Sequence, residues 1–363
     1  MQPLTETPPG NAPDAPRSVC LLRLSAIGDT CHVVPVLRTL QRAWPQTKFT
    51  WIIGKTEARL MSLVEGVEFI IVDKRAGLAA RREMRNRLRE REFDVLLHMQ
   101  LAFRASLVAR SVRAAAKVGF DRKRARELQW MFTNRRIQAR TREHVMDSFF
   151  GFAEALGVKD RVVSWDIPLP QDALDYAQKL IPDARPTLVI SPCSSHSLRN
   201  WRSERYAEVA DYAARQHGMR VILCGGPTAL ERKVGETIEA AMKTPVINQI
   251  GRDTLPQLLA LLDRATVLVA PDSGPVHMAT MVRTPVVGLY AATNPARSGP
   301  YLSRPWCVNA YAEAARRFRH RPPERLPWTE KIEERGVMDL ITVAQVTAKL
   351  DQALQYTQRL GSD

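Results

Sequence analysis

The sequence predicts an α/β protein of two Rossmann-like halves, and three observations support that prediction. The chain has 363 residues, more than one hydrophobic core usually spans. Short apolar runs alternate with helical patterns in two separate stretches, which is typical of mostly parallel sheets covered by helices. Between these stretches, residues 164–186 carry four prolines and interrupt the alternation, as a connection between domains would.

The first stretch begins after a tail rich in proline and polar residues, 1–17, which we expect to be disordered. Buried-strand patterns follow at 18–24, 48–54, 68–73, 94–99 and 117–120. Helical patterns lie between them at 32–44, 57–66, 79–92 and 103–115. We therefore expect an N-terminal Rossmann-like domain over 18–165, followed by an interdomain linker at 166–186.

The second stretch repeats the alternation more clearly. Strands are predicted at 187–191, 219–226, 245–250, 265–270 and 285–290. Helices are predicted at 203–218, 228–242, 254–265, from Pro275, and at 343–360. These patterns indicate a C-terminal Rossmann-like domain over 187–340. The last segment, 341–363, is predicted to be a helix that packs on either half, including back on the N-terminal domain.

The composition indicates the kind of partner and compartment. A net charge of +15 favours an anionic partner: nucleic acid, phospholipid headgroups or a phosphorylated substrate. The five cysteines are scattered and form no CxxC pair, as in a reducing compartment. No apolar run approaches the roughly 20 residues of a membrane span, and the N-terminal tail lacks the apolar core of a signal peptide. We expect a cytoplasmic protein, with contact to a membrane surface left open.

The strands of the second half end in loops of small and polar residues. The first such loop, SPCSSHSLRNW, offers Ser194 and Ser195 hydroxyls and the guanidinium of Arg199. Hydroxyls and a cation ahead of a helix would suit a phosphate. Serines in such loops are equally often helix caps, so from this stretch alone the two interpretations carry equal weight.

Two further loops extend the set. In CGGPTALERK, Glu231 follows Thr228 at the spacing of a capping box, and a capping role is the stronger interpretation from spacing alone. In APDSGPVHMA, three residues come at a strand end just before Pro275: Asp272, Ser273 and Gly274. Backbone amides at that helix start would point at an anion. His277 lies in the first turn, although a lone helical histidine is usually a packing residue.

The first half contains one isolated carboxylate in RLSAIGD. Asp29 lies between the first strand and the first helix, next to Gly28, which would let a ligand come close. An acid at this place is usually an N-cap. The seven histidines form no metal-binding motif such as HExxH, and we expect no metal or other cofactor.

Taken together, RLSAIGD, SLRNW, CGGP and PDSGPVHMA, then TPVVGLY and TNPARSGPY, resemble glycosyltransferase family 9, the ADP-heptose:lipopolysaccharide heptosyltransferases. The resemblance runs from about Ser18 over nearly the whole chain. GFDRKRARE and FTNRRI resemble the acceptor region of the heptosyltransferase I type. The resemblance implies a GT-B fold, two Rossmann-like domains with parallel sheets facing a central cleft. It also implies an inverting, metal-independent transfer from ADP-L-glycero-D-manno-heptose to the Kdo/inner-core region of lipopolysaccharide.

The resemblance also assigns roles to residues. Asp29 matches the catalytic base, and Arg199, where the family commonly has lysine, matches a cation that stabilises the leaving diphosphate. Glu231 matches an acid that contacts the nucleoside. The other matches to the nucleotide-sugar site are Ser194, Ser195, Asp272, Ser273, Gly274 and His277. The sequence departs from the family pattern at Asn294, where an aspartate is typical, and in an added basic stretch at 312–328.

The basic charge concentrates in the acceptor half. Residues 74–92 hold eight Lys/Arg against three Asp/Glu, and residues 121–142 hold eight against two. This suits an anionic Kdo-lipid A acceptor and peripheral contact with the inner membrane. The expected acceptor contacts are Gly28, Lys74, Arg75 and Arg126.

Three alternatives remain open. A non-enzymatic nucleic-acid binder is suggested by the charge, but no RRM, KH or OB signature accompanies it, so nucleic acid is not expected. A sugar-nucleotide epimerase or hydrolase would use the same architecture without an acceptor. Another family 9 transferase would use a different core acceptor or sugar donor.

Overall fold

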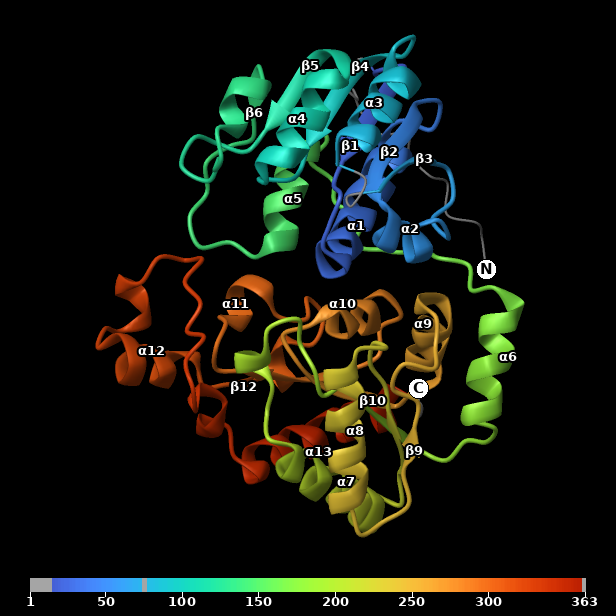
Figure 1. Ribbon diagram of the computed structural model, residues 1–363, viewed down its shortest axis with the longest axis vertical. Helices are drawn as coiled ribbons and strands as arrows, with labels where there is room; N and C mark the ends of the chain where they lie inside the picture. Colours follow the sequence, from blue (N-terminus) through green and yellow to red (C-terminus); the bar gives the residue numbers. More distant parts are fainter. Residues whose placement is uncertain (1–14, 74–76, 361–363) are drawn as a thin grey trace, which may run out of the picture. The chain divides into compact units, whose positions relative to one another are not determined.

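The computed structural model describes residues 15–73 and 77–360, and the chain divides into two compact units (Figure 1). Unit 1 runs to Thr141 and adds Met146–Trp165, and unit 2 comprises Arg142–Val145 and the chain from Asp166 onward. Each unit is a parallel sheet with helices packed against it.

Unit 1 contains six parallel strands in the order β3-β2-β1-β4-β5-β6. The strands are β1 (Ser18–Leu22), β2 (Lys48–Gly54), β3 (Glu68–Val72), β4 (Glu92–His98), β5 (Arg113–Gly119) and β6 (Arg135–Arg136). The helices are α1 (Ile27–Ala43), α2 (Lys55–Met61), α3 (Gly77–Leu88), α4 (Phe103–Ser111), η1 (Gln129–Phe132) and α5 (Val145–Glu154). Since every strand pair is parallel, the residues that follow β1, β4 and β5 share one edge of this sheet.

Unit 2 repeats the plan with the order β12-β11-β10-β7-β8-β9, again all parallel. Its strands are β7 (Thr187–Ile190), β8 (Arg220–Leu223), β9 (Ile247–Asn248), β10 (Val267–Pro271), β11 (Val286–Tyr290) and β12 (Val308–Asn309). Its longer helices are α6 (Gln171–Leu180), α7 (Ser203–His217), α8 (Ala229–Ala241), α9 (Leu255–Arg264), α10 (Gly274–Met281), α12 (Tyr311–Arg319) and α13 (Val343–Leu360). The short ones are η2 (Ser197–Arg199), α11 (Pro295–Ser298), η3 (Arg304–Trp306), η4 (Pro323–Arg325) and η5 (Val337–Leu340).

The central strands are buried on both faces, which explains why they are continuous apolar runs. Every residue of β7, β10 and β11 is buried. The five cysteines are all buried as free thiols, and burial raises the pKa of Cys193 to about 11. Thus they pack as small apolar side chains. In the described part of the chain, no helix combines the length and apolar character needed to cross a bilayer.

The predicted interdomain linker and the C-terminal helix both belong to unit 2. The proline-containing connection, 166–186, includes α6, which packs against α9 through Ala173, Ala177 and Ala260. The C-terminal helix α13 packs on α7 and β11 through residues such as Val346 and Leu350. The sequence left open on which half this helix packs. Its core contacts are with the C-terminal half.

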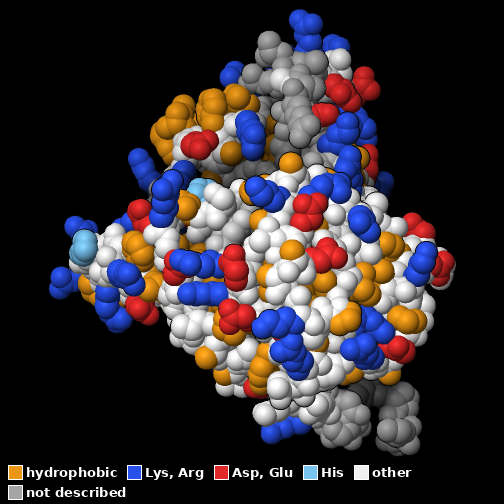
Figure 2. All heavy atoms as spheres, turned by 60° about the horizontal axis from the view of Figure 1, so that its bottom comes forward, with side chains coloured by type: hydrophobic (Ala, Val, Ile, Leu, Met, Phe, Trp, Pro, Cys, Tyr) orange, Lys and Arg blue, Asp and Glu red, His pale blue; other side chains and the backbone are white. Residues whose placement is uncertain are grey.

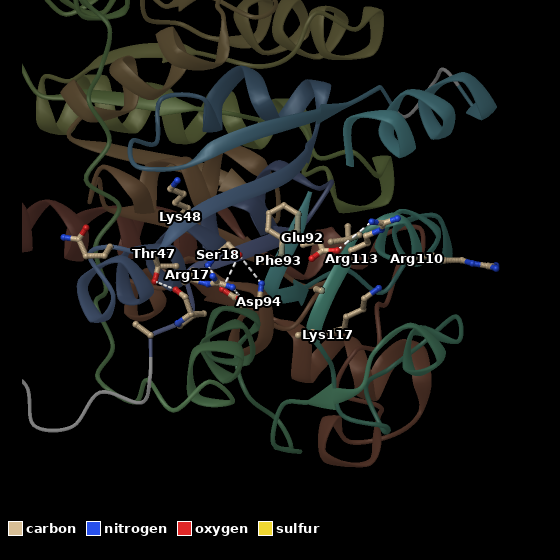
Figure 3. Close-up of a pocket in the computed structure, with 16 residues that line it drawn as sticks. Arg17, Ser18, Thr47, Lys48, Glu92, Phe93, Asp94, Arg110, Arg113 and Lys117 are labelled. Atoms are coloured by element: carbon tan, nitrogen blue, oxygen red, sulfur yellow. Dashed lines mark hydrogen bonds and ion pairs between the residues drawn. The ribbon is translucent and has the colours of Figure 1, made fainter. Parts of the chain in front are cut away.

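A groove of about 990 Å³ lies at the edge of the unit 1 sheet where the strands begin (Figure 3). Ser18, Lys48, Asp94 and Arg113, near the first residues of β1, β2, β4 and β5, line it. Ligands of parallel α/β sheets bind beyond the opposite, carboxyl ends of the strands. The functional site is therefore expected at the other edge.

Candidate active site

Asp29 lies in the first turn of α1, the helix that follows β1 after a short loop. The N-cap is Ala26, so the interpretation of Asp29 as the N-cap is wrong. Its Oδ2 accepts hydrogen bonds from the Ala26 N–H, at 3.3 Å, and from the Arg23 guanidinium. The side chain is 33% exposed, and Gly28 precedes it in the same turn. The carboxylate of Asp29 is thus fixed by hydrogen bonds and still accessible to solvent, at the carboxyl edge of the sheet.

Arg23 is a functional candidate that the sequence reasoning missed. Its side chain is only 12% exposed, and its guanidinium lies 5.2 Å from the centre of the Phe149 ring. Besides Asp29, it donates to the backbone carbonyl of Met99 at 2.6 Å. A fixed positive charge therefore stands behind the carboxylate of Asp29.

Arg199 lies at the carboxyl edge of the unit 2 sheet, between two acids. Its Nη1 is 3.6 Å from Oδ2 of Asp272, which follows β10. Its Nε and Nη2 donate to Oε1 of Glu333 at 2.8 and 2.6 Å. Burial alone would raise the pKa of Glu333, but the hydrogen bond and charge of Arg199 outweigh it and hold that pKa below its usual range. The guanidinium and the carboxylate are both charged, in fixed positions.

Two hydroxyls beside this cluster are buried and have no hydrogen-bond partner among the described residues. Ser273, next to Asp272, is the N-cap of α10, but its Oγ caps nothing. Tyr290, at the end of β11, is fully buried. Burial and the nearby Asp272 hold the pKa of Tyr290 well above its usual range, so it stays a neutral donor. Buried donors without partners are rare in folded proteins, and a bound anion would satisfy them.

Other predicted residues lie on the same edge of unit 2. Ser194 donates from its backbone N–H to Asn200 at 2.7 Å, while Ser195 is exposed. Gly274 begins α10, and His277 is buried one turn further on. The structure thus brings the strand-end residues of β7 and β10 together around Arg199, as parallel strands require.

Glu231 has a local capping environment. Thr228 caps α8 by accepting from the Glu231 N–H, which is one half of the predicted capping box. The carboxylate of Glu231 accepts from the Thr228 hydroxyl at 2.6 Å and from the Gly226 N–H at 3.1 Å. The side chain is half-buried beside the loop that follows β8. A contact to a nucleoside stays a prediction.

The predicted acceptor residues are described only in part. Arg126 is exposed on the segment after β5. Lys74 and Arg75 lie outside the described residues. Asn294 caps α11 by accepting from the Ala296 N–H at 3.0 Å, a role that an aspartate would also perform. Within the ranges 15–73 and 77–360, no group of three His, Cys, Asp or Glu side chains is placed to hold a metal ion.

The three residues that sequence reasoning missed gave different signals. Arg23 sits six residues before Asp29, and a basic residue at the end of an apolar strand could have drawn attention. Tyr290 reads as an ordinary strand residue. Glu333 is 134 residues from Arg199 in the chain, and the sequence around Glu333 contains no motif that indicates a functional role.

Comparison with known proteins gives consistent results. The model of glycosyltransferase family 9 (heptosyltransferase) matches residues 81–326. The lipopolysaccharide core heptosyltransferase OpsX of Haemophilus influenzae is 41% identical over 337 residues, covering 93% of this chain and 97% of its own. The lipopolysaccharide heptosyltransferase 1 of Pseudomonas aeruginosa is 26% identical, covering 78% and 81% of the two chains.

Solved structures show the same fold. A family 9 glycosyltransferase from Veillonella parvula aligns with a TM-score of 0.77 at 22% identity, covering 94% of this chain and 97% of its own. The Escherichia coli heptosyltransferase WaaC with ADP aligns with a TM-score of 0.71 at 22% identity, covering 93% and 99%. The predicted α/β class, GT-B with two Rossmann-like domains, is confirmed.

Proposed function

Because this chain belongs to glycosyltransferase family 9, the heptosyltransferases, we propose that it moves heptose from ADP-L-glycero-D-manno-heptose to the Kdo/inner-core region of lipopolysaccharide. The protein is a glycosyltransferase of lipopolysaccharide core synthesis. The likeness to OpsX over 93% of the chain is the observation on which the proposal rests. The donor, the acceptor and the residue roles below belong to the proposal.

The proposed reaction is a single displacement with inversion. The oxygen of an acceptor hydroxyl forms a bond to the anomeric carbon of the heptose, and the bond from that carbon to the ADP oxygen breaks. ADP leaves with the electron pair, and the acceptor proton passes to Asp29. A carboxylate suits this role because the hydroxyl becomes acidic only as the new bond forms. The accessibility of Asp29 and its fixed Oδ2 contacts support it.

The unit 2 cluster would hold the donor. Arg199 would neutralise the charge that develops on the departing diphosphate, with Ser194, Ser195 and Gly274 supplying nearby hydroxyl and backbone N–H groups. The unpartnered hydroxyl of Ser273 supports an anion-binding role. Glu231 and Asp272 would contact hydroxyls of the nucleoside and sugar, because carboxylates accept from hydroxyls and are repelled by phosphate. His277, in the same loop as Asp272, would contact the sugar or the diphosphate.

The acceptor would bind at the carboxyl edge of unit 1, near Gly28 and Arg126. Lys74 and Arg75, the other two proposed acceptor contacts, lie outside the described residues. Kdo-lipid A is anionic and anchored in lipid, which agrees with the two basic stretches of this half. The proposed place of action is accordingly the cytoplasmic face of the inner membrane, with peripheral association.

The test mixes purified protein with ADP-heptose, with and without Kdo-lipid A, and follows ADP release and product mass. Transfer predicts ADP release that depends on the acceptor, and a product heavier by one heptose. Release without acceptor would indicate a hydrolase, and a changed sugar without release an epimerase. Asp29→Asn should lower kcat by about 100-fold or more while ADP binding persists; near-normal turnover would remove Asp29 from the mechanism.

A further inference from the structure

Four exposed hydrophobic side chains lie close together on unit 1. They are Phe103, Leu128, Trp130 and Met131, with exposed fractions of 43%, 51%, 39% and 61%. They make up half of the eight large hydrophobic residues that are exposed in the described part of the chain. Contacts join their two segments: the start of α4 packs on η1, and the Phe103 ring meets the Phe132 ring edge-on at 6.2 Å.

A buried side chain holds this cluster in place. Gln129 is fully buried between the exposed neighbours, and its Nε2 donates to the carbonyls of His98 and Gln100 at 2.8 and 3.1 Å. Its Oε1 accepts from the Phe120 N–H at 3.1 Å. Leu128 has a φ of 59°, in the left-handed region that side-chain-bearing residues rarely adopt. An outward-pointing leucine kept in an unfavourable backbone conformation is typical of a functional surface.

Exposed basic side chains lie on the same segments of chain as the hydrophobic ones. The Arg122 guanidinium lies 5.6 Å from the centre of the Trp130 ring. Further exposed bases on the same segments are Arg104, Lys123, Arg126, Arg135 and Arg136. The exposed acid among them, Glu127, accepts from the Phe103 N–H. Figure 2 shows a group of hydrophobic side chains with basic and acidic ones beside it, at the upper left.

We propose that this surface, Phe103, Leu128, Trp130 and Met131 with Arg122, docks unit 1 on an anionic phospholipid bilayer. Tryptophan and arginine suit the headgroup region, and leucine and methionine suit the acyl boundary. The basic rim complements anionic lipid. Single-stranded nucleic acid would also bind exposed tryptophan and arginine side chains. Binding to nucleic acid would not, however, require exposed leucine and methionine side chains beside them.

The position of the docking surface suits the lipid-anchored acceptor, and in this respect the inference rests on the proposed function. The surface follows the carboxyl ends of β4 and β5, the edge of the sheet at which Asp29 follows β1. Gln100, which bonds Gln129, also accepts from the Leu24 N–H at 2.6 Å and donates to the Ser25 hydroxyl at 3.3 Å. A bilayer bound here would present sugars linked to its lipids at the edge that carries Asp29.

The test is co-sedimentation of the full chain with vesicles, without donor or acceptor. One set is phosphatidylcholine, and the other contains about one third phosphatidylglycerol. The wild type should bind the anionic set at least about tenfold better. The double variant Trp130→Ser/Met131→Ser should lose at least about tenfold in that affinity, since burial of two such side chains is worth more than one factor of ten. Arg122→Gln should weaken binding more at low salt than at high salt.

The matched control is Ile71→Ser, which removes a 43% exposed hydrophobic side chain elsewhere on unit 1, in β3. It should bind as the wild type does, and thermal melting confirms that each variant is folded. Any of four results would overturn the proposal. The double variant could bind as well as the wild type, or the control could lose as much affinity as the double variant. The wild type could bind only vesicles that contain lipid A, or it could prefer an oligonucleotide.

Activity on a deacylated, water-soluble acceptor separates the two proposals. The double variant should retain wild-type turnover on it, because its side chains have no role at the reacting groups. Lost vesicle binding with retained turnover would support the docking surface. Vesicle binding by a wild type that transfers no heptose would overturn the proposed function and leave the docking surface supported.

Discussion

Arg23 donates a hydrogen bond to the carboxylate of Asp29 across the turn between β1 and α1. The arginine is 12% exposed and the aspartate 33%, so the pair is shielded on the cationic side and open on the acidic side. Both fixed contacts use Oδ2, and Oδ1 has no hydrogen bond within the described residues. This geometry fixes the orientation of the carboxylate and leaves Oδ1 open, and in the proposed reaction this oxygen would accept the proton of the acceptor hydroxyl.

Replacing Arg23 should lower turnover, because Arg23 orients the carboxylate of Asp29. Arg23→Met removes the hydrogen bond that holds Oδ2, so the carboxylate is no longer fixed toward the acceptor hydroxyl of the proposed reaction. We expect kcat to fall by about tenfold or more while ADP binding persists. Arg23→Lys keeps a cationic donor and should show a smaller loss. Steady-state kinetics at saturating donor measure this, and a wild-type kcat in Arg23→Met would contradict it.

The pairing of Arg199 with Glu333 leads to a second prediction. Glu333 accepts two hydrogen bonds from the guanidinium and so orients it. In the proposed role of Arg199, the negative charge of Glu333 would compete with a diphosphate for the same N–H groups. Glu333→Gln keeps an acceptor oxygen and removes the charge, so ADP should bind a few-fold more tightly. Glu333→Ala removes the orienting contact too, and kcat should fall.

Calorimetric titration with ADP measures the affinities of both variants. Glu204→Gln is a suitable control, because it removes an acid from the first turn of α7. Weaker ADP binding by Glu333→Gln, with an unchanged control, would show that orientation outweighs charge competition at Arg199.

Much of the fold could be predicted because buried parallel strands are continuous apolar runs. TLVIS and PVVGLY have no amphipathic alternative, and they form β7 and β11. The prediction was wrong at residues 113–115, which were assigned to a helix but begin β5. Alanine favours helices locally, and pairing with β4 overrides that preference.

The grouping of candidate residues was predictable where they are neighbours in one loop, as Asp272 and Ser273 are. It was not predictable where tertiary structure supplies the partner. Glu333 reaches Arg199 only because the chain after α12 returns to the end of β7. No spacing in the sequence encodes that contact.

The buried histidine at the end of β4 predicts a pH dependence of stability. Burial, together with Arg23 and Lys117, lowers the pKa of His98 to about 3. The unfolded chain then binds more protons than the folded one between about pH 3 and pH 6.5. This contribution to stability is complete above about pH 6.5 and is lost as the pH falls, by up to about 1.4 kcal/mol per pH unit.

Urea unfolding at several pH values measures this dependence. His98 also bonds the Ser106 hydroxyl at 3.0 Å, so His98→Gln keeps a polar partner there. The variant should unfold at a lower urea concentration at neutral pH but with a flatter dependence below about pH 6. An equally steep dependence would assign the acid sensitivity to other groups.

Two adjacent glycines after β8 give a matched test of Glu231. A Cβ at Gly226 would lie 2.7 Å from Oε2 and 3.2 Å from Oε1 of Glu231, so the carboxylate would have to move. Movement would break its bonds to the Thr228 hydroxyl and the Gly226 N–H. If Glu231 binds the nucleoside, Gly226→Ala should weaken ADP binding by about tenfold.

A Cβ at Gly225 would lie 3.5 Å from Ile250 and 3.8 Å from Glu231, which are ordinary contacts. Gly225→Ala should therefore keep ADP affinity within about twofold, although it removes the neighbouring glycine. Titration calorimetry with ADP, on variants of equal melting temperature, compares the two. Only Gly226→Ala displaces the carboxylate of Glu231. Equal ADP affinities of the two variants would therefore mean that this carboxylate contributes nothing to binding, and would exclude Glu231 from the nucleoside site.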